Sequence, residues 1–179
     1  MTDPTHGPGA ELVDVRDPQD PDGRVVGTAT RADVRARNLP HAATGVLLRD
    51  DAGRVFVHRR TTTKDVYPGC HDCFAGGVLA AGEEPDAGAA RELAEELGVR
   101  DVVLRPVLRH WYRDDDTHYL AHVYEARWDG RPLVLQPSEV DAGWWATVRQ
   151  LGSALAHPSW PFVPDTRRLL SLWPGWQGS

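Results

Sequence analysis

Three glutamates in one short segment are the side chains best suited to chemistry in this chain. Glu92, Glu95 and Glu96 fall at positions i, i+3 and i+4, so on a helix they project from neighbouring points of one face. Two such carboxylates about 6 Å apart repel each other by roughly 3 kcal/mol at an effective dielectric constant near ~20. A divalent cation relieves this repulsion, because a hard ion prefers carboxylate oxygens and retains water and substrate phosphates. A solvated acidic helix face is the alternative interpretation.

The residues around these glutamates follow a fixed spacing over residues 77–99. The pattern is Gly77-x5-Glu83-x7-Arg91-Glu92-Leu93-x-Glu95-Glu96-x-Gly98-Val99. This segment resembles the signature of the Nudix hydrolases, with every fixed position matched. As a loop–helix–loop it also makes structural sense, since Gly77 lets the backbone turn and Glu83 lies in the loop ahead of the helix. Arg91 is placed to orient Glu83 or Glu95 through charge-assisted hydrogen bonds.

The resemblance implies a fold, a metal and a reaction. The fold is an α/β/α sandwich around a mixed β-sheet, and the reaction is hydrolysis of a diphosphate linkage attached to another group. By analogy, Glu92, Glu95 and Glu96 hold Mg²⁺ or Mn²⁺, with the alternative that Glu92 instead acts as the base toward the attacking water. Some members recruit an acidic residue from outside the signature. Glu139 is the best-placed candidate here, with an exposed loop glutamate as the alternative.

A small basic patch precedes the signature in an otherwise acidic chain. Arg59, Arg60 and Lys64, the only lysine, are the expected contacts to substrate phosphate outside the metal site. Gly76 and Gly77 are expected to approach the substrate with their backbone. Solvated loop charges are the alternative interpretation of the three basic residues.

Segments outside the signature resemble one branch of the superfamily, the branch that contains isopentenyl-diphosphate isomerase. These segments are an N-terminal pair of strands, HRRTTTKDVYPGCHD and HPSWPFVPDTRRLL. The isomerases need a cysteine and a histidine where this chain has Ala75 and Gly77, and paired glutamates that its best-matching segment, residues 116–119, lacks. We therefore expect a hydrolase of a small diphosphate, a nucleoside diphosphate derivative. The alternatives are an isomerase-like enzyme and a non-catalytic nucleotide-binding module, which has no need to keep every signature position.

Two further features look chemical but carry less weight. Cys70 and Cys73 form a single C-x2-C pair, and without a second pair a structural zinc site is not expected. Seven tryptophans are many for this length; some must be core, and one is a candidate to stack on a nucleobase. Large aromatic residues near the C-terminus are also typical of a dimer surface, so a homodimer is a possible assembly.

The elements that must position these residues are readable from hydrophobic periodicity and turn residues. Residues 1–10 read as a loose tail and 11–179 as a single domain that begins with a β-hairpin. The best-defined helix is 85–97, with Ala90, Leu93 and Leu97 facing the core and Gly98 ending it. Strands are expected at 11–16, 24–28, 41–49, 54–59, before 76–77, and at 102–112, 118–128 and 143–147, and further helices at 31–37, 148–156 and 165–173. This order, without regular βαβ alternation, predicts a mixed sheet flanked by helices.

Length and charge limit the remaining possibilities. The 179 residues carry 26 acidic and 20 basic side chains, a net charge of −6, which disfavours a protein that coats long nucleic acids. Apolar stretches are far shorter than the ~20 residues of a membrane span. The N-terminus lacks the order of a secretory signal, and two cysteines cannot build a disulfide framework, so a reducing cytoplasm is expected.

Overall fold

A mixed sheet of seven strands forms the centre of the computed structural model, which describes residues 9–64 and 66–176. The expected tail at residues 1–10 lies outside this described part, except for its last two residues. In chain order the elements are β1 (Leu12–Arg16), β2 (Val25–Thr30), α1 (Arg31–Ala36), β3 (His41–Asp50), β4 (Val55–Arg60), β5 (His71–Asp72), β6 (Phe74–Val78), α2 (Pro85–Leu97), β7 (Arg105–Arg113), β8 (His118–Trp128), β9 (Val140–Ala146), α3 (Val148–Ala156) and α4 (Pro164–Leu172).

The sheet divides along β3, and this division creates room for a site. On one side β3 runs parallel to β8 over its whole length, from His41 opposite Tyr119 to Asp50 opposite Trp128. On the other side β3 pairs antiparallel with β6 over residues 43–47 and reaches β4 only at Arg49. Strand β9 extends the sheet beyond β4, β5 pairs with residues 58 and 59 of β4 on the side of β3, and β7 closes the opposite edge against β8.

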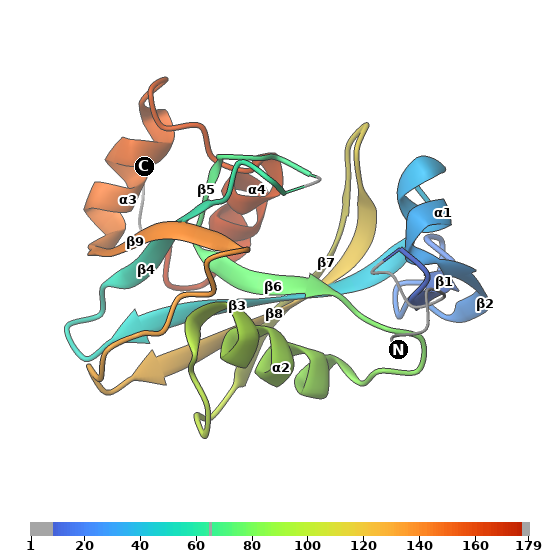
Figure 1. Ribbon diagram of the computed structural model, residues 1–179, viewed down its shortest axis with the longest axis horizontal. Helices are drawn as coiled ribbons and strands as arrows, with labels where there is room; N and C mark the ends of the chain where they lie inside the picture. The colour runs from blue at the N-terminus through green and yellow to red at the C-terminus, as the bar shows by residue number, and fades with distance from the viewer. Residues whose placement is uncertain (1–8, 65, 177–179) are drawn as a thin grey trace, which may run out of the picture.

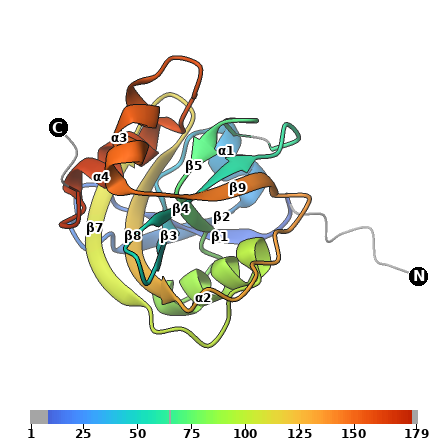
Figure 2. The same cartoon turned by 90° about the vertical axis from the view of Figure 1, so that its left-hand side faces the viewer.

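Helices cover both faces of this sheet, as Figures 1 and 2 show. Alternation along β3 sends Leu47 toward one hydrophobic cluster and Val46 and Leu48 toward the other. The first cluster includes side chains of α3 and α4, and the second includes side chains of α2. The α/β/α sandwich with a mixed sheet predicted from the sequence is therefore confirmed.

Helix α2 begins and ends where its sequence predicts. Pro85 occupies the first turn, and Gly98 ends the helix at φ +68°, a left-handed conformation that glycine adopts without strain. The prediction that Ala90 faces the core is wrong, because Ala90 is exposed and Ala89 is completely buried. The buried residues of the helix are therefore Gly88, Ala89, Leu93, Glu96 and Leu97.

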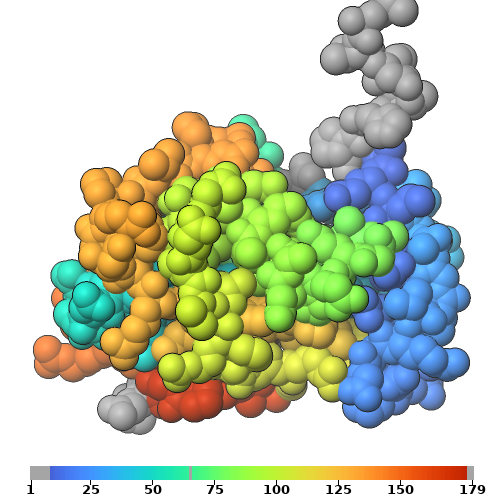
Figure 3. All heavy atoms as spheres, turned by 90° about the horizontal axis from the view of Figure 1, so that it is seen from below, coloured from blue at the N-terminus to red at the C-terminus, as the bar shows by residue number. Residues whose placement is uncertain are grey.

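An N-terminal β-hairpin lies beside the loop that leads into helix α2. Strands β1 and β2 pair antiparallel in a separate sheet, as predicted. The hairpin contacts the loop ahead of α2, because Ala81 N–H donates to the Leu12 carbonyl (2.8 Å) and Gly82 N–H to the Asp14 carboxylate (2.9 Å). Figure 3, which views this face, shows the hairpin in blue beside α2 in green. Helix α1 follows, with the Thr30 side chain capping it by accepting from Asp33 N–H.

The C-terminal part supplies the opposite layer. Strand β9 begins at Val140, three residues earlier than predicted, and α4 spans Pro164–Leu172 where 165–173 was expected. Trp173 is buried in the core, so this aromatic residue serves the fold and not a dimer surface. Within the described residues, no helix has the length and apolar character needed to cross a membrane.

Candidate active site

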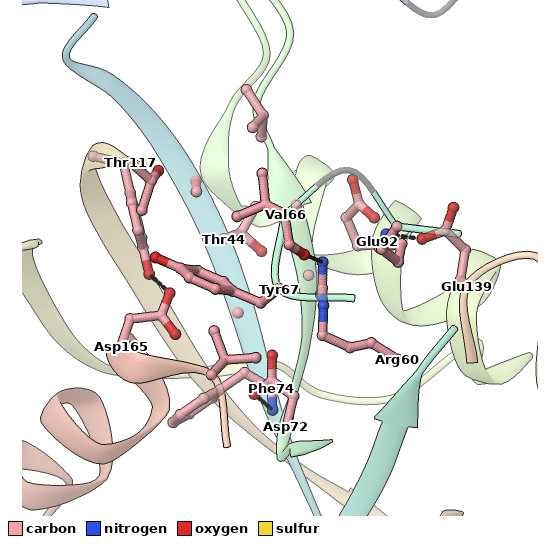
Figure 4. Close-up of a pocket in the computed structure, with 18 of the residues that line it drawn as sticks. Thr44, Arg60, Val66, Tyr67, Asp72, Phe74, Glu92, Thr117, Glu139 and Asp165 are labelled. Carbon is pink, nitrogen blue, oxygen red and sulfur yellow. Dashed lines mark hydrogen bonds and ion pairs between the residues drawn. The ribbon is translucent and has the colours of Figure 1, made fainter. Parts of the chain in front are cut away.

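A cavity of about 1150 Å³ lies where the sheet divides, lined by residues of α1, β3, β4, β5, β6, α2, β8 and α4 and of the loops that connect them. Figure 4 shows its interior. One end is formed by the glutamates of α2 with Arg60, Lys64 and Glu139. The other end is formed by Asp72, Phe74, Tyr119 and Asp165, with the ring of Tyr67 between the two ends. The predicted catalytic segment therefore lies in the wall of a cavity large enough for a nucleotide-sized ligand.

Arg91 holds the carboxylates of the α2 end together. Its guanidinium donates to both oxygens of Glu83 (2.8 and 3.0 Å), to Glu92 (2.8 Å) and to Glu95 (3.2 Å). The hydrogen bond from Arg91 lowers the pKa of Glu83, and the same bond raises the pKa of Arg91. Glu83 in turn accepts from Ala80 N–H (2.9 Å), which ties the loop to the helix. The structure thus places Arg91 as sequence reasoning predicts, with contacts to both candidate partners.

The three helix glutamates do not share one environment. Glu96 is buried, whereas the side chain of Glu95 is half-exposed at the rim. Burial raises the pKa of Glu96 to about 8, against the opposing charge of Lys64. Burial also raises the pKa of Glu92, and the charge of Arg91 opposes this. Glu92 and Glu96 therefore form a carboxylate pair whose charged forms are disfavoured by burial, although Arg91 and Lys64 lie nearby.

Gly76 and Gly77 are glycines because of close approach and not because the backbone turns. Both lie in strand β6, and neither has a positive φ, so the expected turn at Gly77 is wrong. A Cβ on Gly77 would lie 2.5 Å from Glu92 Oε1, and a Cβ on Gly76 would lie 1.9 Å from the Thr44 carbonyl oxygen. Gly76 N–H donates to Glu96 Oε2 at 3.3 Å. Gly77 therefore lets β6 pass directly beside Glu92, and Gly76 lets β6 pack closely against the backbone of β3.

The predicted basic patch is divided between two faces of β4. Lys64 forms an ion pair with Glu139 inside the cavity, and Arg60 lines the same end and donates to the Val66 carbonyl (3.0 Å). Arg59 does not line the cavity, because neighbouring residues of a strand point to opposite faces, and it pairs instead with Asp141. The structure thus brings Arg60, Lys64 and Glu139 to the glutamates and corrects the expectation for Arg59.

The residues at this end fit a hard divalent cation in kind. The donors on hand are carboxylate oxygens, and two of these carboxylates, Glu92 and Glu96, are largely removed from solvent. In the structure Arg91 and Lys64 supply the positive charge that neighbours these carboxylates. In the part of the chain that the structure describes, no three His, Cys, Asp or Glu side chains stand in a formed metal-binding group. Residues 92, 95 and 96 would therefore hold a cation after side-chain adjustment.

Cys70 and Cys73 are free thiols, and neither lines the cavity. Cys73 is buried in the hydrophobic cluster beneath α3 and α4, and burial raises the pKa of its thiol well above the usual range. Since the buried thiol is neutral, it is a poor nucleophile and a poor metal ligand.

Sequence reasoning did not single out the far end of the cavity. Asp72 and Asp165 come from β5 and α4, and Tyr119 comes from β8. No motif links these positions, because only the folded chain brings them together. Tyr67, with φ +49°, gives a structural signal, since a bulky residue in the left-handed region is uncommon and often marks a functional loop.

Comparison with known proteins identifies the family. The model of the NUDIX domain matches residues 39–170. An uncharacterized Nudix hydrolase of Rhodococcus erythropolis is 43% identical over 174 residues, covering 92% of each chain. A second, from Streptomyces coelicolor, is 37% identical over 171 residues, covering 94% of this chain and 91% of the relative. A crystal structure of a Deinococcus radiodurans protein superposes with a TM-score of 0.74 at 26% identity, covering 89% of this chain and 96% of the other. The chain therefore belongs to the Nudix family and is a Nudix hydrolase.

Proposed function

We propose that this protein is a divalent-metal-dependent hydrolase that cleaves the diphosphate linkage of a nucleoside diphosphate derivative, with Mg²⁺ or Mn²⁺ held by Glu92, Glu95 and Glu96. The observation that carries the proposal is the buried Glu96 beside the largely buried Glu92, at one end of a cavity whose wall also holds Lys64 and Arg60. Carboxylates attract the cation, and the basic residues match the negative charge of phosphate. A cavity of about 1150 Å³ leaves room beyond the diphosphate for a further group.

The side chains of this end have separate tasks in the proposed reaction. When bound, the metal polarises a phosphoryl oxygen and neutralises charge on the leaving group. Glu92 takes the proton of the attacking water, and Arg91 fixes the carboxylates of Glu83 and Glu92 for that task. Lys64 and Arg60 contact phosphate oxygens, and Glu139 orients Lys64 through their ion pair.

A substitution pair tests this function. Glu96→Gln keeps the size of the side chain and removes its charge, so we expect metal-dependent release of phosphate-containing products from a nucleotide panel to fall at least about a hundredfold. Glu84→Gln is the matched control, because Glu84 is exposed at the N-terminus of α2 and its side chain makes no capping hydrogen bond. Circular dichroism checks that both variants are folded. Turnover that persists in EDTA, or in both Glu96→Gln and Glu92→Gln, contradicts the proposal.

The isomerase and the binding module predict different results in the same assay. An isomerase would incorporate deuterium into isopentenyl diphosphate in heavy water, although Ala75 and Gly77 stand where the isomerases have cysteine and histidine. Tight nucleotide binding without turnover at saturating Mn²⁺ would indicate a binding module. We favour the hydrolase, acting as a cytoplasmic enzyme, because the signature keeps its complete set of charged residues.

A further inference from the structure

Tyr67 stands in the middle of the cavity, between the glutamates of α2 and the end formed by β5 and α4. It follows β4 in the chain, and Figure 4 shows its ring in the hollow, between Asp165 on one side and Arg60 on the other. None of the steps of the proposed hydrolysis uses this side chain. A ring that occupies the centre of a ligand-sized cavity is placed to contact the ligand.

The backbone of Tyr67 is held in an unfavourable conformation. Its φ is +49°, in the left-handed region, although the next residue, Pro68, favours extended backbone at the position before it. A bulky residue keeps such a conformation only where its surroundings hold it. The guanidinium of Arg60 donates to the Val66 carbonyl (3.0 Å), directly before Tyr67. The fold therefore imposes the direction in which this side chain leaves the backbone.

Asp114 fixes the other end of the side chain. Its Oδ2 accepts from the Tyr67 hydroxyl and from the Tyr112 hydroxyl (2.9 Å). Its Oδ1 accepts from the N–H groups of Asp116 (2.9 Å) and Thr117 (2.8 Å), which fixes the turn between β7 and β8. Because both oxygens of Asp114 are bonded, the carboxylate has one position, and the ring of Tyr67 is held at both of its ends.

The faces of the Tyr67 ring are free to contact a ligand. Among the residues that the structure describes, the contacts between aromatic rings and between cations and rings do not include this ring. Beyond it, Phe74 and Leu169 line the cavity, and the carboxylates there already accept from the hydroxyls of Thr166 and Tyr119. A ligand that extends past Tyr67 therefore meets a ring face and apolar side chains.

We propose that Tyr67 is a specificity-determining residue whose ring packs against the base of the nucleoside attached to the diphosphate, and that Asp114 is the positioning residue that fixes the ring for this contact. The inference rests on the proposed function, which places the diphosphate at the glutamates of α2. A flat base suits a fixed ring, because aromatic faces stack in offset arrangements and gain from a set orientation. An apolar chain has no flat face and gains nothing from that orientation.

Two ligands that cannot be hydrolysed separate the ring contact from catalysis. Methylenediphosphonate fills only the diphosphate end, and α,β-methylene-ADP adds a ribose and a base. Dissociation constants of both are measured by calorimetry on the full chain with Mg²⁺. Since every base has a flat face that stacks, we expect the wild type to bind the ADP analogue at least about tenfold more tightly. In Tyr67→Ala the ADP analogue should bind about tenfold more weakly, and methylenediphosphonate should stay within about twofold of the wild type.

Tyr67→Phe and Asp114→Ala test the positioning. Tyr67→Phe keeps the ring and loses the hydroxyl, so we expect the ADP analogue to bind about threefold more weakly, a smaller loss than in Tyr67→Ala. Asp114→Ala should give a similar loss in the wild type and no further loss in Tyr67→Phe, because a general disturbance of the turn would appear in both backgrounds. Tyr112→Phe is the matched control. It removes the other hydroxyl from the same oxygen, and Tyr112 is not among the residues that line the cavity, so both constants should stay unchanged.

Three results would overturn the inference or part of it. An equal loss of both ligands in Tyr67→Ala, folded by circular dichroism, would show that the ring only supports the cavity wall. A wild type that binds the two ligands alike would exclude a contact to the base, and this comparison needs no variant. A further loss on adding Asp114→Ala to Tyr67→Phe would remove the role of Asp114. Metal-dependent turnover that is abolished by Glu96→Gln would leave the proposed function standing in each case, whereas the absence of such turnover would contradict that function and not the ring contact.

Discussion

The close approach of Gly77 to Glu92 leaves the carboxylate of Glu92 little space at the α2 end of the cavity. Arg91 binds three carboxylates from one side, and β6 passes against Glu92 from the other. The carboxylate of Glu92 is therefore confined between a guanidinium and a strand that has no side chain at this point. A small displacement of a reacting group costs much of a reaction rate, because catalysis depends on orientation.

Gly77→Ala tests this confinement at the residue scale. The new methyl carbon would start 2.5 Å from Glu92 Oε1, so the carboxylate must move away. We expect kcat to fall at least about tenfold. The melting temperature should fall by only a few degrees, since the end of a side chain gives way more easily than backbone. Gly27→Ala in β2 is the control, because a Cβ there meets no atom within 4 Å. Unchanged kcat in Gly77→Ala would contradict this role of the glycine.

At the scale of elements, α2 depends on its C-terminal glycine. Gly98 has φ +68°, and a Cβ there would lie 2.7 Å from the Cβ of Val134. We expect Gly98→Ala to lower the free energy of unfolding by about 1–2 kcal/mol, measured by urea denaturation. Gly152→Ala in α3 is the matched substitution, and we expect it to raise the free energy of unfolding instead of lowering it. Its Cβ would meet only a Trp176 ring atom at 3.7 Å, so we expect stabilisation of about 0.5–1 kcal/mol. Equal effects of the two changes would contradict the argument.

The elements also show what sequence can and cannot predict here. Helix α2 was predictable because Pro85, the apolar spacing and Gly98 are local signals. Ala90 was misplaced because one helical position rotates a side chain by about 100°, enough to move it from core to solvent. The parallel pairing of β3 with β8 and the meeting of Asp72 with Asp165 depend on long-range topology. Such pairings leave no local pattern in the chain.

The net charge of −6 of the whole molecule does not describe how charges are distributed around the cavity. The cavity places carboxylates at both ends, with Lys64 and Arg60 beside the glutamates of α2. The acidic excess thus weighs against long nucleic acids, while Lys64 and Arg60 match the negative charge of phosphate in a small ligand. The buried carboxyl groups Glu96 and Asp165 have raised pKa values and favour the folded state at lower pH.

Buried histidines act in the opposite direction and give the molecule an acid sensitivity. Burial lowers the pKa of His41, His58 and His122 to about 4, so all three are neutral in the folded protein at neutral pH. The unfolded chain, with a pKa near ~6.5, binds more protons between these values. Each histidine therefore contributes stability that is complete above about pH 6.5 and is lost as the pH falls through about 4.

His58→Leu isolates one of these contributions from the opposing carboxyl groups. His58 is 2% exposed, and its Nδ1 has no partner among the residues described, so leucine replaces it at little cost near pH 7. We expect the free energy of unfolding of the variant, relative to the wild type, to rise by about 2 kcal/mol between pH 7 and pH 5, because leucine cannot take up a proton. Urea denaturation at each pH measures this difference, in which the carboxyl contributions cancel. His157→Leu, at an exposed position, is the control for the loss of a surface histidine. A constant difference between His58→Leu and wild type across this range would show that His58 is not the source of the acid sensitivity.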